Sequence, residues 1–187
     1  MRGTLSRQQR AGCASRGPLN ADVRWLVTNA LVGALVICGA SALLEGLAAG
    51  RGVKQRFAEL QLPRYSPPLA VWIGIGVLYY VIYFAISYRL LSAGVGFSLR
   101  GGAFALLLVL MGINIFWNVL FFRRKDLHAS YFGFWPYLLV ALALLLALRT
   151  ADTLAAWIFL PYVLYLGYAI WWGRRLWQLN RSVPRAA

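Results

Sequence analysis

Five uncharged apolar runs, each about twenty residues long, fill most of this 187-residue chain. A helix rises about 1.5 Å per residue, so about twenty apolar residues cross the roughly 30 Å hydrocarbon core of a bilayer. Hydrocarbon offers no hydrogen-bond partners, and each run must therefore satisfy its own backbone polar groups within a helix. The sequence predicts an all-α fold, an integral membrane bundle of five transmembrane helices. The five runs cover residues 25–44, 69–88, 101–122, 129–148 and 153–173.

The net charge of +14 comes from basic residues that gather in the connections and tails. In a soluble protein such a charge would suggest nucleic acid as a partner. Here it indicates contact with membrane lipid headgroups, and no nucleic-acid partner is expected. The connections at 45–68 and 123–128 hold seven Lys and Arg residues, against three in 89–100 and 149–152. The positive-inside rule then places the C-terminus in the cytoplasm, as for a bacterial inner membrane; an organellar membrane is the alternative.

Composition divides the chain into three parts. Residues 1–24 are predicted to be a basic, disordered N-terminal tail, residues 25–180 the membrane domain and residues 181–187 a C-terminal tail. The arginines of the first part also fit an organellar targeting segment, which stays open as an alternative. The two cysteines suggest no disulfide framework, and the single histidine, His128, provides no ligand set for zinc or haem. We therefore expect no metal and no cofactor.

The third span carries a candidate binding face. Asn114, Trp117 and Phe121 are spaced i, i+3 and i+7, so they share one side of a helix. An amide in hydrocarbon needs a partner, and the simplest interpretation is that Asn114 bonds to a neighbouring helix. Glu45 is the one carboxylate near the membrane interior, and its position at the end of the first span is typical of a boundary residue.

Tyrosines form similar faces on two other spans. Tyr162, Tyr165 and Ala169 share a side of the last helix, and Tyr79 and Tyr83 are one turn apart on the second. Aromatic residues near a membrane surface usually form interfacial belts, but Tyr162, Tyr165 and Tyr168 lie deeper. Several inward aromatic faces favour a flat, apolar pocket with a few polar groups.

The order and spacing of several motifs resemble the TspO/MBR family over about residues 25–180. The second span begins after the Pro-Pro pair at 67–68, and the third ends with the pattern N-x-x-W-x-x-x-F-F at 114–122. The last span contains the family's Pro-Tyr pair at 161–162. The resemblance implies a five-helix pocket that binds porphyrins, sterols and synthetic benzodiazepine-type ligands, often within a homodimer. Some bacterial members are similar in promoting light-dependent breakdown of protoporphyrin.

The chain departs from the family at three informative positions. Tyr65 stands where the family usually has the tryptophan of W-x-P-P, and Tyr165 and Gly173 replace its usual tryptophan and asparagine. The proline-stiffened connection at 50–68 is the one connection long enough to reach across the bundle. We expect it to close over the pocket, with Tyr65 covering the ligand.

The leading hypothesis is a membrane receptor or carrier that binds tetrapyrroles such as protoporphyrin IX, and sterols or other lipids. The second is an enzyme-like, light-dependent degradation of porphyrin, for which no conventional catalytic constellation is present. The third is a transporter of an unrelated small solute. The predicted ligand-binding residues are Tyr65, Tyr79, Tyr83, Asn114, Trp117, Phe121, Tyr162, Tyr165 and Ala169. A loose sterol-recognition pattern, L-x-Y-x5-R, is met by Leu166, Tyr168 and Arg174.

Overall fold

The structure is a computed structural model that describes residues 17–93 and 99–181, with side chains from Trp25 onward. Within these residues, five helical segments are long and apolar enough to cross a membrane, which confirms the predicted bundle. The predicted tails lie largely outside the described residues, although helix already begins at Gly17. The spanning elements are α1 (Gly17–Ala49), α3 (Leu69–Ser92), α4 (Leu99–Asn118) with the π-helix η2 (Val119–Arg123), α5 (Leu127–Phe132) with α6 (Phe134–Ala151), and α7 (Thr153–Asn180).

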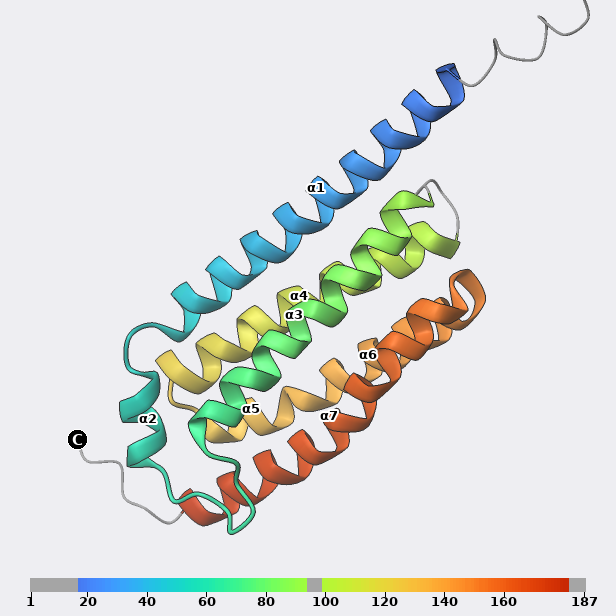
Figure 1. Ribbon diagram of the computed structural model, residues 1–187. Coiled ribbons are helices and arrows are strands. Elements are labelled where there is room, and N and C mark those ends of the chain that lie inside the picture. Colours follow the sequence, from blue (N-terminus) through green and yellow to red (C-terminus); the bar gives the residue numbers. More distant parts are fainter. Residues whose placement is uncertain (1–16, 94–98, 182–187) are drawn as a thin grey trace, which may run out of the picture.

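The helices pack side by side, with α1 against α3 and α4, α6 against α4 and α7, and α7 against α3 (Figure 1). Consecutive spans are antiparallel because their connections are short. The connection between α1 and α3 is longer than the others, and it contains an additional short helix, α2 (Val53–Glu59). In Figure 1, α2, η2 and the C-terminal end of α7 lie at the same end of the bundle. We call this the α2 end.

Large apolar side chains fill the half of the bundle away from the α2 end. The fully buried residues of this core come from α3, α4, α6 and α7, and each contributes side chains at helical spacing. They include Ile86, Leu90, Leu107, Leu110, Leu144, Leu148 and Phe159. The filled half fixes the helices relative to one another, so that an open space is possible only toward the α2 end.

The third span changes its hydrogen-bonding pattern near its end. The amide N–H of Arg124 donates to the carbonyl of Val119 (2.9 Å), and that of Asp126 to Leu120 (3.1 Å). The first of these is the five-residue step of a π-helix, which inserts an extra residue into a turn, and the second spans six residues where the helix ends. Lys125 follows with a positive φ of 53° and redirects the chain into α5.

Asp152 holds the opposite end of the bundle together. Its carboxylate caps α7 by accepting the N–H of Ala155 (3.0 Å), and it binds Arg89 of α3 through Nε (2.9 Å) and Nη2 (3.0 Å). Burial works against the charged form of Asp152, but the hydrogen bonds from Arg89 and Ala155 outweigh it and lower the carboxyl pKa below its usual 3.8. The pair therefore joins α3 to the turn between α6 and α7.

We predict that Asp152→Asn keeps the helix cap but loses the ion pair. In detergent micelles at pH 7 its free energy of unfolding should fall by about 1 kcal/mol, a charge-assisted bond discounted for the partial exposure of Arg89. Because the folded pKa of Asp152 is depressed, this stabilisation is present above about pH 3.8 and is lost as the pH falls through the lowered value. The difference between variant and wild type should therefore shrink below pH 3.8.

Asp126→Asn is the matched control, since Asp126 caps α5 through the N–H of Ala129 (2.9 Å) and belongs to no ion pair among the described residues. Its thermal unfolding should differ little from that of wild type at any of these pH values. An equal loss of stability in both variants would show that the pair with Arg89 contributes nothing.

Candidate ligand-binding cavity

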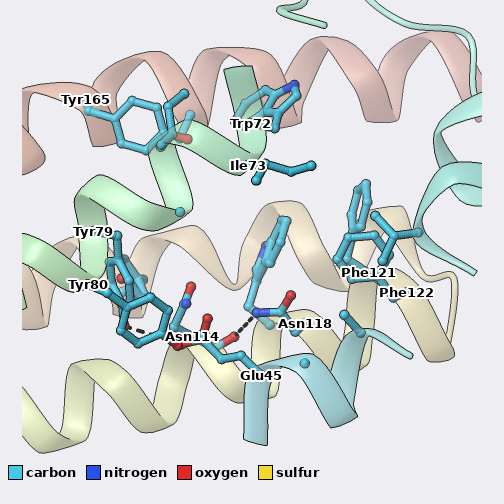
Figure 2. Close-up of a pocket in the computed structure, with 18 of the residues that line it drawn as sticks. Glu45, Trp72, Ile73, Tyr79, Tyr80, Asn114, Asn118, Phe121, Phe122 and Tyr165 are labelled. Carbon is cyan, nitrogen blue, oxygen red and sulfur yellow. Dashed lines mark hydrogen bonds between the residues drawn. The ribbon is translucent and has the colours of Figure 1, made fainter. Parts of the chain in front are cut away.

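A partly enclosed cavity of about 420 Å³ lies toward the α2 end of the bundle (Figure 2). All five spans contribute to its wall, together with η2 and α2. This volume lies within the range of roughly 300–1,000 Å³ that small-molecule sites occupy. Its wall is mostly apolar and aromatic, so the space suits a ligand that is itself largely apolar.

Small residues create the space. Ala42, Gly46 and Ala49 follow one another at helical spacing on α1, Gly76 lies on α3, and Ala169 on α7. None of these side chains extends into the region between the helices, which larger residues would fill. The cavity therefore exists because small residues on α1, α3 and α7 leave space among large aromatic residues.

The wall formed by α4 and η2 is a rigid aromatic surface. Trp117 stacks on Phe121 with ring centroids 4.9 Å apart and planes 12° apart, and its indole N–H donates to the carbonyl of Ser130 (3.0 Å). Phe134 of α6 lies 5.6 Å from Trp117. These contacts fix the indole plane before any ligand arrives. The π-helix also brings the consecutive residues Phe121 and Phe122 to the same cavity.

A second wall comes from α3 and α7, and it meets the first where Trp172 lies 6.2 Å from Phe121. Tyr162, Tyr165, Ala169 and Trp172 share one side of α7, as their spacing predicts, and all four line the cavity. Trp72 of α3 packs on Trp172 with a centroid distance of 4.7 Å. The indole N–H of Trp172 is already used, since it donates to the hydroxyl of Ser66 in the first connection (3.0 Å).

Tyrosines close the deep end of the cavity, which we call the floor. Tyr79, Tyr137 and Tyr162 line it, and the hydroxyls of Tyr137 and Tyr162 share a hydrogen bond. Tyr79 packs on Tyr162 (5.5 Å) and on Tyr83 (4.1 Å). Tyr83 itself is fully buried beneath the floor and does not line the cavity.

Glu45 is the one charged side chain among the described residues that line the cavity. Its carboxylate accepts a long hydrogen bond from the hydroxyl of Tyr79 (3.5 Å), and the side chains of Tyr80 and Asn114 lie beside it. Figure 2 shows Glu45 and Asn114 close together, on the other side of the cavity from Trp72. Asn114 thus links two helices, as expected of an amide in a membrane span.

The first connection covers one side of the cavity. Val53 and Phe57 of α2 line the cavity on this side, and we call the side of the cavity next to α2 the mouth. The buried Arg56 donates to the carbonyl of Lys125 (3.2 Å) and lies over the ring of Phe121 (5.7 Å). The ammonium group of Lys125 binds the carboxylate of Glu59 (3.0 Å), whose pKa it lowers.

Further polar contacts tie the first connection to its surroundings. The guanidinium group of Arg123 donates to the carbonyls of Leu47 and Ala48, in the last turn of α1. Gln61 and Asn180 exchange two hydrogen bonds of 3.0 Å, which join the connection to the end of α7. The first connection is thus held in place by contacts with η2, with Lys125 just after it, and with α7.

The structure brings seven of the nine predicted ligand-binding residues to this cavity. Tyr83 is one exception, and Tyr65 is the other. Tyr65 is 68% exposed, while its backbone carbonyl accepts a hydrogen bond from the hydroxyl of Tyr168 (2.9 Å). In this arrangement α2, rather than Tyr65, is the part of the first connection that lines the cavity. The seven are Tyr79, Asn114, Trp117, Phe121, Tyr162, Tyr165 and Ala169.

The residues of the sterol pattern do not form one site. Leu166 lines the cavity, Tyr168 reaches the first connection, and Arg174 is exposed. Several lining residues were not predicted from the sequence, because nothing in the spacing of one helix shows which residue of another it faces. They include Ala42, Glu45, Trp72, Tyr80, Phe134 and Tyr137.

Comparison with protein-family models matches the chain to the TspO/MBR family over residues 33–177. The matched segment contains every residue that lines the cavity. A comparison with curated proteins found no match.

Gly173 provides a test of the packing behind the cavity wall. A Cβ there would lie 2.7 Å from Cε2 of Phe134, a lining residue, whereas a Cβ at Gly167 of the same helix would meet nothing within 4 Å. We predict that Gly173→Ala is less stable to thermal unfolding than Gly167→Ala by about 1–3 kcal/mol, the usual cost of overpacking. Both substitutions replace glycine with alanine in the same helix and gain the same helix propensity, so the difference in their stabilities reports the clash of the new Cβ with Phe134. Equal stabilities would mean that Phe134 moves aside freely.

Proposed function

The chain belongs to the TspO/MBR family, and on that premise we propose that its cavity binds a tetrapyrrole such as protoporphyrin IX, or a sterol-like molecule. The observation that carries this proposal is the aromatic cavity itself. Trp117 and Phe121 present stacked rings on one side, while Tyr165 and Trp72 lie on the other. A planar, apolar ring system gains contact area and ring stacking between two such surfaces.

The charge distribution at the mouth also supports a porphyrin. Arg51 and Lys54 flank Val53, and Arg64 follows in the same connection; all three are exposed. Protoporphyrin carries two carboxylates at one edge of its ring. With that edge at the mouth the carboxylates reach basic groups, while the opposite edge enters the apolar cavity.

A titration with protoporphyrin IX, followed by quenching of tryptophan fluorescence, tests the proposal. Trp72, Trp117 and Trp172 all line the cavity, so a bound porphyrin should quench the emission saturably. The titration is run in the dark, and cholesterol is tested as a competitor. Absence of saturable binding by both molecules would contradict the proposal.

Light-dependent breakdown of porphyrin is a second candidate, favoured by the same three tryptophans. Transfer of an electron from an indole to the excited porphyrin would leave an indole radical and a reduced ring, and breakdown of that ring would also need dioxygen from solution as the oxidant. Illumination of the complex should then reduce the porphyrin absorbance faster with the protein than without it. A rate that does not depend on the protein would leave binding alone as the function.

We predict that Trp117→Ala weakens protoporphyrin binding by about 1–3 kcal/mol, because the ring loses the indole surface against which it stacks. The bound fraction is measured from the porphyrin absorbance, which does not depend on the number of tryptophans. Trp177→Ala is the matched control: Trp177 stacks on Tyr131 (5.6 Å) at the same end of the bundle but does not line the cavity. Equal losses in the two variants would place Trp117 outside the binding site.

We also predict that Ala169→Leu reduces protoporphyrin affinity by about tenfold or more while the protein stays folded. Ala169 is 4% exposed and lines the cavity, so a larger side chain occupies space that the ligand needs. Gly167→Leu adds bulk two residues earlier, on an exposed side of α7, and serves as the control. Wild-type affinity in Ala169→Leu would show that the ligand does not reach α7.

A further inference from the structure

Glu45 is a charged group in an otherwise uncharged, aromatic cavity. It lies one turn before the end of α1, and its side chain contacts the floor through Tyr79 and the α4 wall through Asn114. An ionised carboxylate only accepts hydrogen bonds, and each of these neighbours can donate one. The surrounding protein thus supplies dipoles for the carboxylate.

The protein supplies no cation for it within the described part of the chain. No Lys or Arg lines the cavity, and none of the ion pairs includes Glu45. The nearby basic residue Arg123 is occupied with the carbonyls of Leu47 and Ala48. A carboxylate removed from water without a counter-charge is costly, and a ligand that carries a positive charge would relieve that cost.

We propose that Glu45 makes this cavity selective for ligands whose apolar ring body carries a protonated amine. This inference rests on the proposed function, since it assumes that the cavity binds a small apolar molecule. The amine pairs with Glu45, and the ring body lies along the aromatic walls. Anionic groups of a ligand are directed away from Glu45, toward the basic mouth.

The aromatic surroundings of Glu45 suit the same chemistry. The rings of Tyr79 and Tyr80 meet edge to face with centroids 4.8 Å apart, and both line the cavity beside the carboxylate. Aromatic faces attract organic cations through their quadrupoles, and this attraction increases when water is excluded. A carboxylate combined with two tyrosine rings therefore recognises a cation better than either element does alone.

A structural role is the competing explanation, because Glu45 also joins α1 to α3 and α4. The two roles differ in what they predict for ligands. Loss of a purely structural contact changes the affinity for every ligand by a similar factor. Loss of a cation partner changes the affinity for amines alone, so the ratio between matched ligands separates the two roles.

The experiment compares cholesterol with its 3β-amine analogue and its sulfate ester. These probes share one ring body and differ only in the charge of the polar end. Binding of radiolabelled probes is measured in nanodiscs of neutral phosphatidylcholine, with empty nanodiscs as the blank, for wild type, Glu45→Gln, Glu45→Asp and Asp126→Asn. The last variant removes one negative charge at the same end of the bundle and keeps its helix cap. Protoporphyrin IX binding is measured in parallel.

Wild type and Asp126→Asn should bind the amine at least about tenfold more tightly than cholesterol, the effect of one charge-assisted hydrogen bond. The sulfate should bind most weakly. In Glu45→Gln the preference for the amine should fall below about threefold, while cholesterol affinity changes little. Glu45→Asp keeps the charge at a greater distance and should keep an intermediate preference, which also provides a reading if Glu45→Gln does not fold.

No preference for the amine in wild type, or an unchanged preference in Glu45→Gln, would overturn the inference. If cholesterol or protoporphyrin still binds in that case, the proposed function stands. If neither the sterol probes nor protoporphyrin binds to wild type, the proposed function fails, and the selectivity of Glu45 fails with it.

Discussion

The hydrocarbon environment allows this chain no backbone conformation but the helix in its spanning segments, and the rest of the structure follows from that constraint. Helices cannot bend apart freely to make a pocket, so the cavity has to come from differences in side-chain size. Leu107 and Leu144 fill one half of the bundle, whereas Gly46, Gly76 and Ala169 leave the other half open. The site is therefore the part of a regular helical bundle in which the side chains are too small to fill the space between the helices.

The mouth depends on a different kind of interaction. The last carbonyls of a helix have no partners within it, and Arg123 satisfies those of Leu47 and Ala48 at the end of α1. Arg56 does the same for the carbonyl of Lys125, where the chain leaves η2. Each bond is modest at a wet interface, but together they hold α2 over the cavity. Closure is thus achieved with polar contacts, while the walls are built from apolar ones.

Local sequence patterns accounted for the spans and for single faces, because both depend on spacing within one helix. Asn114, Trp117 and Phe121 share a side of the third span, and all three line the cavity. The short helix α2 has no such signal, since a seven-residue helix in a connection lacks the apolar length of a span. The position of Tyr65 was predicted from its place before Pro67 and Pro68. The structure instead turns its ring outward and uses its carbonyl as the acceptor for Tyr168.

Glu45 shows most clearly what one helix cannot reveal. At the end of an apolar run it resembles any boundary residue, and its partners Tyr80 and Asn114 lie 35 or more positions away in sequence. Its role follows from the tyrosines of the floor, because each buried hydroxyl needs a hydrogen-bond partner. The hydroxyls of Tyr137 and Tyr162 bond to each other, so the hydroxyl of Tyr79 needs a different acceptor, which is Glu45. A carboxylate has about four acceptor positions, and the hydroxyl of Tyr79 takes one of them, while the side chains of Tyr80 and Asn114 lie beside the carboxylate. The remaining positions and the uncompensated charge are what the protein offers to a ligand, so one residue both completes the floor and defines the polar chemistry of the cavity.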